Sequence, residues 1–270
     1  MKIHGTAKGG ALSKQDFGVA FSAGSSTGIS DADLKVYWKC NETETPVENK
    51  STSSDSLGTA ANMATTNVTF GETGILGESI LFDGSSYGNV GTSVSQFNFC
   101  HVTDHKWSIA FWYKSTNAPS AFETIFATAA NSTGGNVGFV IALHSSRRFF
   151  IDMFDGNASA APLDDDLTGD NIIPNDDDWH FFVFTFDATL ASENLKIFVD
   201  GDVDDPYTAN YTNSPSTTAN ASYLMCIGRR TNSSEKFFDG ELDEVSIWDK
   251  ILDSDTIAAL YNSGDGQAIY

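Results

Sequence analysis

Short runs in which apolar and polar side chains alternate recur along most of this chain. The clearest is KWSIAFWYK at Lys106–Lys114, where every second residue is large and apolar. A period of two places successive side chains on opposite faces of an extended strand, so this run predicts a β-strand with one strongly apolar face. Comparable runs of aromatic and β-branched residues predict eight further strands: Leu34–Cys40, Ile80–Asp83, Val137–Leu143, Phe149–Phe154, Trp179–Phe186, Leu195–Val199, Tyr223–Gly228 and Glu244–Trp248.

Clusters of Gly, Asn, Asp and Ser separate the predicted strands. The pair Asp200-Gly201 follows one strand and is a hairpin signal, because both residue types accept the backbone angles of a tight turn. The aspartate triplets at 164–166 and 176–178 predict solvated loops, since adjacent like charges are favoured by water. The pattern as a whole is typical of a β-sandwich, in which aromatic and aliphatic side chains fill the space between two sheets: Trp107, Phe111, Trp179, Phe182, Phe184, Phe186, Ile197 and Val199.

One helix is predicted, near the C-terminus, over Asp253–Asn262. Asp253 or Ser254 can cap its first turn, and its apolar residues recur at helical spacing. Gly264 is expected to end it in a left-handed conformation. No period of 20 to 50 residues repeats, which argues against solenoids and propellers.

Composition agrees with a folded all-β protein. The 270 residues are 40% hydrophobic, enough for one large β domain or two small ones. The formal charge of −21 repels phosphate backbones, so nucleic acid is not expected as a partner, whereas cations are. No apolar run is long enough to insert into a membrane, and the first residues contain no continuous apolar segment of a secretion signal. The three cysteines, Cys40, Cys100 and Cys226, are expected to be buried thiols.

Residues 1–30 differ from the remainder, which suggests an extended N-terminal arm on a single domain at 31–270. The arm is rich in glycine and serine and combines Lys2, His4, Lys8 and Lys14 with a single acidic residue. A basic arm on an acidic body predicts docking to other copies of the chain or to a larger shell protein.

Seven segments, in this order, resemble laminin-G-like (LamG) and pentraxin-type domains of the concanavalin A-like jelly-roll class. They are LKVYWKCNE, GILGESILFDGSSYGNV, WSIAFWYK, DDWHFFVFTFD, LKIFVDG, LMCIGRR and FDGELDEVSIWDKILDSDTIAALY, spread over residues 34–264. The resemblance implies an all-β jelly-roll sandwich of two antiparallel sheets with one short C-terminal helix. The opening KIHGTAKGGALSKQDFGVAF also resembles leaders of marine viral and microbial proteins that carry a LamG-like body.

Domains that resemble this one often bind calcium, and hard oxygen ligands are abundant here. The candidate ligands are Asn41 after the first strand, Asp83 before a glycine turn, and Asp243 in the last strand. The alternatives are turn chemistry for Asp83 and a buried carboxylate bonded to backbone amides for Asp243.

The last strand also carries a possible hydrolase motif, which strand parity disfavours. Glucanases that share the jelly roll use an E-x-D-x-E run, whereas here the second glutamate comes one residue early. Glu241 and Asp243 are therefore expected on one face and Glu244 on the other, so two catalytic carboxylates could not converge without a bulge. We expect no catalytic residues and no enzyme.

Three histidines are candidates for a functional role. Trp-His at the start of a strand is common in the resembling family, which implies packing and hydrogen bonding for His180 rather than catalysis. His101 and His105 are four apart in a predicted loop, so the helical geometry that would bring both to one zinc ion is missing.

Eight N-x-S/T sequons are glycosylation candidates if the chain meets a glycosylating machinery: Asn41, Asn49, Asn67, Asn131, Asn157, Asn210, Asn220 and Asn232.

Two functions remain open, and a third is disfavoured. The first is a non-enzymatic structural or attachment protein of a virus particle or another extracellular assembly. The second is a calcium-assisted lectin, with exposed aromatic residues such as Tyr87, Tyr207 and Tyr211 stacking on sugars. The third is a glycoside hydrolase.

Overall fold

The computed structural model describes residues 28–115, 119, 122–130, 135–156, 172–174, 176–209, 217–231 and 236–270. The predicted arm residues Lys2, His4, Lys8 and Lys14 lie outside this range, as do Asn131, Asn157, Asn210, Asn232, Tyr211 and the triplet at 164–166. Of the predicted arm, Ile29 is buried against the domain.

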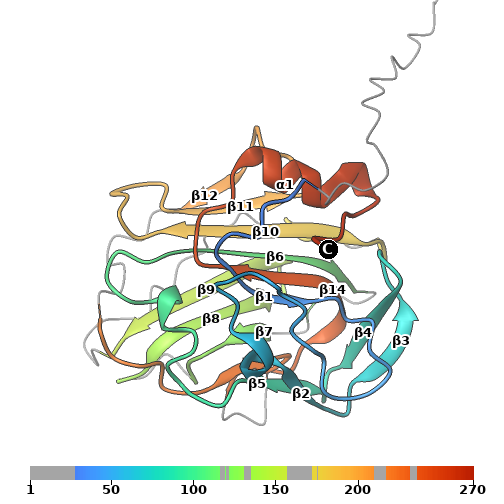
Figure 1. Cartoon of the computed structure of the whole chain (residues 1–270), viewed down its shortest axis with the longest axis horizontal. Coiled ribbons are helices and arrows are strands. Elements are labelled where there is room, and N and C mark those ends of the chain that lie inside the picture. The colour runs from blue at the N-terminus through green and yellow to red at the C-terminus, as the bar shows by residue number, and fades with distance from the viewer. Residues whose placement is uncertain are drawn as a thin grey trace, which may run out of the picture.

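Two antiparallel sheets form the described part of the chain (Figure 1). The large sheet has eight strands, in the order β12-β11-β10-β6-β14-β4-β3, and β1 also pairs with β14. Its strands are β1 (Leu34–Trp38), β3 (Thr69–Thr73), β4 (Glu78–Asp83), β6 (Lys106–Lys114), β10 (His180–Asp187), β11 (Leu195–Val199), β12 (Tyr207–Ala209) and β14 (Asp239–Trp248).

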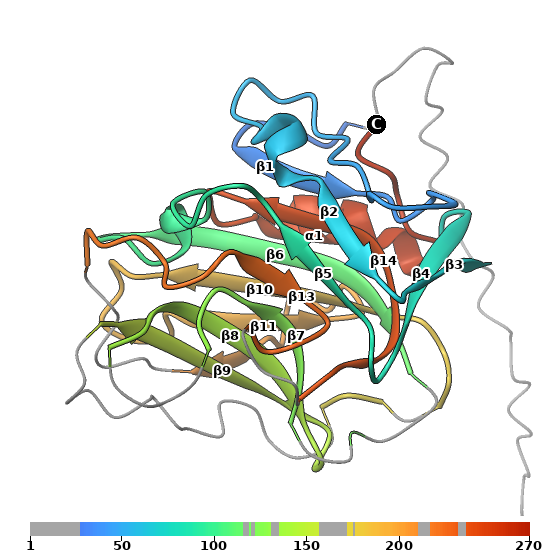
Figure 2. The ribbon, with the colours of Figure 1, turned by 90° about the horizontal axis from the view of Figure 1, so that it is seen from below.

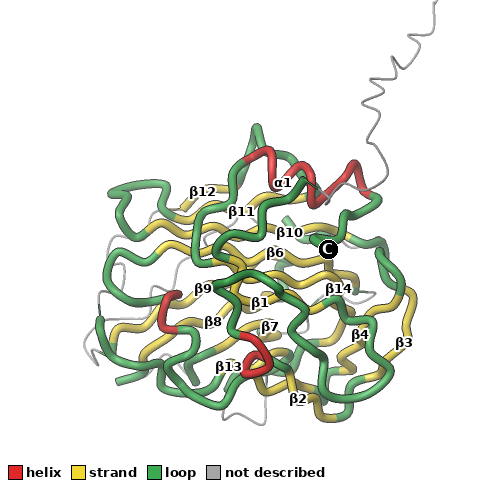
Figure 3. Tube along the Cα trace, in the orientation of Figure 1, coloured by secondary structure: helices red, strands yellow, loops and turns green. Residues whose placement is uncertain are grey.

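The small sheet has six strands, in the order β2-β5-β13-β7-β8-β9. These are β2 (Met63–Thr66), β5 (Tyr87–Val90), β7 (Glu123–Ala127), β8 (Val137–His144), β9 (Arg148–Asp155) and β13 (Met225–Ile227). Three 3₁₀ turns occur at Gly58–Ala61, Asn98–Cys100 and Asn262–Gly264 within the described residues. Figure 3 shows how far strands outweigh helices. The predicted all-β sandwich is confirmed.

The main core fills the space between the sheets with aromatic rings. Phe111 on β6 is fully buried, and its ring centroid lies 5.3 Å from Phe126 of the small sheet and 5.9 Å from Phe184 on β10. Six of the predicted inward residues are buried in this core, and Val199 is partly buried against it. Trp179 is the exception: it lies just before β10 and packs on the outer face of the large sheet.

A second apolar layer covers that outer face. The helix α1 (Ser254–Tyr261) contributes Ile257 and Leu260, and Tyr261 stacks on Trp112 of β6 at 5.7 Å. In Figure 2 the small sheet lies in front of the large sheet, with α1 behind it. The large sheet is therefore covered on both faces along β10, β6 and β14.

The ends of α1 confirm one cap and correct the other. The Asp253 carboxylate accepts the Thr256 N–H at 2.7 Å, as an N-cap should. At the C-terminus the left-handed cap is Asn262, at φ 48° and ψ 47°, two residues before Gly264, whose φ is also positive. Asparagine tolerates this region better than most residues, so the helix ends two residues earlier than the glycine predicts.

All three cysteines are buried and unpaired, and no described helix is long and apolar enough to cross a membrane.

Phe111→Ala should lower the free energy of unfolding by about 3–5 kcal/mol, because it leaves a cavity between two sheets that cannot collapse. Chemical denaturation monitored by tryptophan fluorescence measures the loss. Leu190→Ala is the control, since Leu190 is 47% exposed and its truncation should change little. Equal losses in the two variants would contradict the assignment of this core.

Candidate functional site

The carboxylates of β14 lie where this strand changes partners. Residues 239–242 pair with β4, whereas 245–248 pair with β1. The register with β6 shifts between Asp243 and Ser246, which is a β-bulge, and Glu244 has a φ of +50°. The ends of three strands therefore meet around two acidic residues.

The bulge overturns the parity prediction for Glu244. The Tyr37 hydroxyl on β1 donates to the Glu244 carboxylate and accepts the Ile269 N–H at 3.2 Å, and both Tyr37 and Ile269 belong to the helix-side layer. Glu244 thus reaches the helix side, where Asp243 and Glu241 also make their contacts. The extra residue of the bulge cancels the alternation on which the prediction rested.

The carboxylates of Asp243 and Glu241 on β14 are both engaged by neighbouring groups. Asp243 is fully buried, and its oxygens accept the N–H groups of Ile75 at 2.8 Å, Leu76 at 3.1 Å and Glu244 at 2.8 Å. Glu241 accepts from the Ser79 hydroxyl at 2.7 Å and pairs with Lys114 at 3.2 Å. These contacts link the strand to the 74–77 turn and to β6, which is a structural role.

Burial sets the protonation of this cluster. Desolvation raises the pKa of Glu244 to about 8, although the Tyr37 hydrogen bond lowers it, and the charge of Asp243 adds to the rise. Desolvation also raises the pKa of Asp243, to about 6, against its three backbone hydrogen bonds. The Tyr37 pKa rises as well, through burial and the neighbouring Glu244.

The three predicted calcium ligands are not brought together. Asn41 lies beside Asp243: its amide donates to Leu76 O at 3.2 Å and accepts the Glu78 N–H at 2.5 Å, at the start of β4. Asp83 is at the other end of β4, about 17 Å away by strand rise, where it accepts from Ser85 and Ser86. Among the described residues no group of three or more His, Cys, Asp or Glu residues is arranged to hold a metal ion. Calcium binding itself stays a prediction.

The described sequons differ in accessibility. Asn67 and Asn220 are exposed, and Asn41 is exposed despite its bonds to the 76–78 turn. Asn49 is half-buried, and its amide nitrogen donates to Lys35 O, Gly58 O and the Ser56 hydroxyl. We therefore infer that Asn49 braces β1 against the following loop, and that a glycan on this nitrogen would break the brace.

His180 joins two aspartates at the end of the β10–β11 pair. Its Nδ1 donates to Asp200 at 2.8 Å and its Nε2 to Asp176 at 3.0 Å. These bonds raise its pKa to about 9, in spite of partial burial, so the ring is protonated near neutral pH. The predicted hydrogen-bonding role is confirmed.

His101 and His105 are buried, and desolvation lowers the pKa of both, that of His105 to about 4. Each ring bonds a backbone carbonyl: His101 Nε2 to Ala219 O at 3.1 Å, and His105 Nδ1 to Val102 O at 2.6 Å.

A pocket of about 220 Å³ opens beside the β11–β12 turn, lined by Val199, Asp202, Asp205, Pro206 and Tyr207. Tyr207 is 43% exposed, and sequence analysis named it as a candidate for sugar stacking. One oxygen of Asp202 accepts the N–H groups of Asp204 at 3.1 Å and Asp205 at 3.3 Å, which shapes the turn. The pocket itself was not predicted, because a short Asp-rich turn indicates a hairpin but not the hollow that its side chains enclose.

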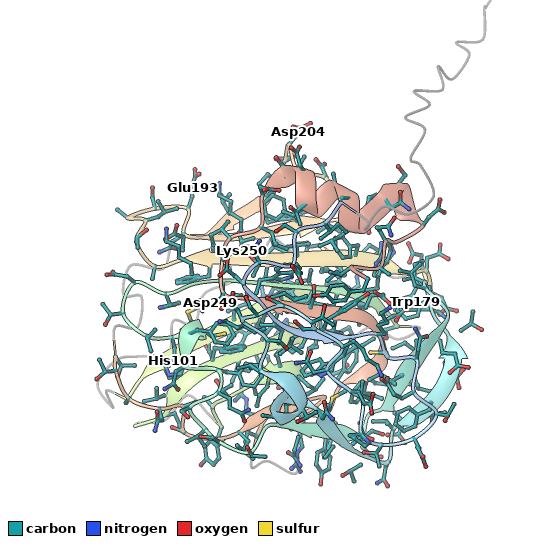
Figure 4. The ribbon with its side chains drawn as sticks, in the orientation of Figure 1. His101, Trp179, Glu193, Asp204, Asp249 and Lys250 are labelled. Atoms are coloured by element: carbon teal, nitrogen blue, oxygen red, sulfur yellow. The ribbon has the colours of Figure 1, made fainter. Side chains whose placement is uncertain are left out.

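The turn that carries the pocket is fixed at its base. Asp200 and Gly201 both have positive φ, and the Asp202 N–H donates to Val199 O at 3.0 Å, so the predicted Asp-Gly turn is present. A Cβ on Gly201 would lie 2.4 Å from the Tyr261 ring, so only glycine lets this turn pack on α1. Figure 4 shows Asp204 at the tip of the turn, beside the helix.

A family model described as the concanavalin A-like lectin/glucanases superfamily matches residues 83–258. This chain belongs to that superfamily. The match runs from the end of β4 into α1 and includes the β14 carboxylates and the pocket, and the chain has the concanavalin A-like fold that the sequence resemblance implied. No curated protein matches the sequence.

Solved structures with this fold are distant in sequence. Domain 4 of AbnA, an extracellular arabinanase of Geobacillus stearothermophilus solved in complex with arabinotriose, is 16% identical with a TM-score of 0.57; the match covers 87% of this chain and 98% of that one. Botulinum neurotoxin type C, whose cell entry depends on two ganglioside molecules, is 16% identical with a TM-score of 0.56, over 86% of this chain and 51% of the toxin chain. A Trypanosoma rangeli sialidase mutant is 15% identical with a TM-score of 0.58, over 88% and 34%.

Glu244→Gln should remove a pH dependence of stability. A carboxyl group whose folded-state pKa is raised stabilises the fold below its ordinary value of 4.5 and loses that contribution as the pH rises to about 8. The wild-type protein should therefore lose stability relative to the glutamine variant across this interval. Urea denaturation at pH 4.5, 6, 7 and 8.5 measures the difference. Glu44→Gln, at an exposed loop position, should follow the wild-type curve, and parallel curves for Glu244→Gln would contradict the buried-carboxyl assignment.

Proposed function

We propose that this chain is a non-enzymatic carbohydrate-binding module whose sugar site is the pocket beside Tyr207. The observation that carries the proposal is the pairing, in one pocket, of an exposed aromatic ring with two aspartates. Sugars present apolar C–H faces that stack on aromatic rings and hydroxyls that donate to carboxylates. A volume of about 220 Å³ suits one or two sugar units rather than a long chain.

The engagement of the β14 carboxylates supports a binding role over hydrolysis. A glycosidase needs one carboxyl group as an acid and a second as a base or nucleophile beside an open cleft. Here Asp243 and Glu244 are buried beneath the helix-side layer, and Glu241 is paired with Lys114. Two structures that share the fold are connected with glycans: an arabinanase domain was solved with arabinotriose, and a neurotoxin depends on gangliosides for cell entry. Both support a glycan as the partner of this chain.

Tyr207→Ala should weaken glycan binding about tenfold, because it removes the stacking surface. A glycan array identifies a ligand, and calorimetry with that ligand compares wild type, Tyr207→Ala and Tyr207→Phe, the last of which keeps the ring. A chelator in a parallel titration tests the proposed calcium requirement. Silence across a diverse array, or equal affinities for Tyr207→Ala and wild type, would refute the site. Cleavage of the ligand that Glu241→Gln abolishes would refute the non-enzymatic assignment.

A second proposal is attachment within a virus particle or another extracellular assembly, through the N-terminal arm. Its support is the contrast between the basic residues 1–30 and a chain of net charge −21. Analytical ultracentrifugation of the full chain and of a chain lacking residues 1–27 should show self-association only when the arm is present. If both are monomers and neither binds particles, this role is wrong.

A further inference from the structure

The basic side chains of this acidic protein are divided between the two sheets. Four described lysines pair with carboxylates: Lys35 with Asp249, Lys50 with Glu42 and Glu48, Lys106 with Asp187, and Lys114 with Glu241. All four arginines of the sequence belong to the small sheet or its turns: Arg147 precedes β9, Arg148 begins it, and Arg229-Arg230 follow β13. Arg229 and Arg230 make different contacts.

Arg230 is half-buried and interacts with a carboxylate of β9. Burial lowers its pKa, while the charge of Asp152 on β9, which is also buried, opposes that change. Arg230 is therefore part of an internal charge arrangement. Arg229 is also half-buried, and its guanidinium lies 3.5 Å above the centre of the Tyr87 ring.

Arg229 stacks on Tyr87 through the face of its guanidinium group. The Arg229 Nε is buried without a hydrogen-bond partner, and the side chain also bonds the Cys226 thiol, so a ligand carboxylate would have to use the terminal N–H groups of the guanidinium. Phe237 lies beside Tyr87, with ring centroids 6.4 Å apart, and extends the aromatic floor. Arg229 makes no ion pair with any described carboxylate.

A second stacked cation lies next to the first. Lys236 precedes Phe237, and its ammonium group is 5.5 Å from the centre of the Phe122 ring, at the start of β7. His144, at the end of β8, packs on the same ring at 4.9 Å. The Thr124 N–H donates to Lys236 O at 3.0 Å and so fixes the lysine backbone to β7. Lys236, like Arg229, makes no ion pair within the described part of the chain.

These residues form one row at one end of the small sheet. β5, β13, β7 and β8 are successive neighbours, and the row from Tyr87 to His144 crosses three strand spacings, about 14 Å. We propose that this row, with Arg229 and Lys236 as its cations and Tyr87, Phe122 and Phe237 as its floor, is a binding site for short carboxylate-bearing saccharides. The site is separate from the Tyr207 pocket and does not rest on it.

The chemistry of the row favours an acidic sugar over other anions. Arg229 offers a bidentate match to a carboxylate, the aromatic rings offer a surface for sugar C–H faces, and Lys236 supplies a second positive charge. A long polyanion such as a nucleic acid would extend past the row onto a protein of net charge −21, which repels it. A ligand of a few sugar units is short enough to stay on the row and avoids this repulsion.

The test is calorimetric titration of the full chain with trigalacturonate and 3′-sialyllactose, two probes with different carboxylated sugars. We expect at least one to bind, and Arg229→Gln with Lys236→Gln to weaken that binding at least tenfold. Tyr87→Leu should weaken it as well, because the guanidinium loses its support. Lys196→Gln, which removes one positive charge from β11 of the large sheet, is the control and should bind as wild type does. Tyr207→Ala should also leave this binding unchanged, which separates the two sites.

Three results would overturn the proposal. Neither probe binds the wild-type protein; the Arg229 and Lys236 double variant binds as tightly as Lys196→Gln; or a hexathymidylate binds as tightly as the sugars, which would make the row a general polyanion site. The neutral probes trimethyl trigalacturonate and lactose should bind at least tenfold more weakly than their acidic counterparts, and equal binding would show that the carboxylate is not what the row recognises. Thermal unfolding of each variant confirms that a loss of binding does not come from a loss of fold.

Discussion

The architecture depends on how β14 passes from one neighbour to another at Asp243. A strand in the middle of a sheet must hydrogen-bond on both edges, and here one edge is shared by β4 and β1, whose ends leave backbone N–H groups of the 74–77 turn without a strand partner. The Asp243 carboxylate accepts two of them, and Asn41 binds the next part of the same turn. A buried carboxylate is costly in general, but one that accepts three N–H groups replaces backbone bonds that the sheet cannot make.

The same junction explains how the outer face of β10, β6 and β14 is covered. The bulge aims Glu244 at Tyr37, whose hydroxyl receives the backbone of Ile269 and so fixes the C-terminal segment over the sheet beside α1. With α1 and this segment in place, the faces of β10, β6 and β14 are covered. The two proposed binding surfaces, the Tyr207 pocket and the Arg229 row, therefore lie at a turn and at the end of a sheet. These two surfaces belong to different sheets and differ in charge, since aspartates line one and stacked cations the other.

The parts that the sequence predicts well are those governed by local periodicity. The strands Lys106–Lys114 and Leu195–Val199 have the predicted bounds, because in each of them successive side chains alternate regularly between the two faces of the sheet. Short strands such as β2 and β5 were missed, since four residues with glycine or threonine carry little periodicity. The prediction of the orientation of Glu244 was wrong for a different reason. A bulge depends on the neighbouring strands, and the residue pattern within β14 does not reveal it. The pocket shows both cases: Tyr207 was named as an exposed aromatic residue, whereas the hollow formed by the turn at 199–207 was not predicted.

The buried histidines and the buried glutamate act in opposite directions on stability as the pH changes. His101 and His105 have lowered pKa values, so their contribution is present above the ordinary value of 6.5 and is lost as the pH falls toward 4. Glu244 contributes most at low pH and loses its contribution by about pH 8, and His180 loses its own between 6.5 and about 9. Between 4.5 and 6.5 the histidine and glutamate effects oppose each other, whereas above 6.5 only losses remain. Stability should therefore fall as the pH rises from 6.5 to about 9, where His180 loses the proton with which it bridges Asp176 and Asp200 at the base of the Tyr207 turn.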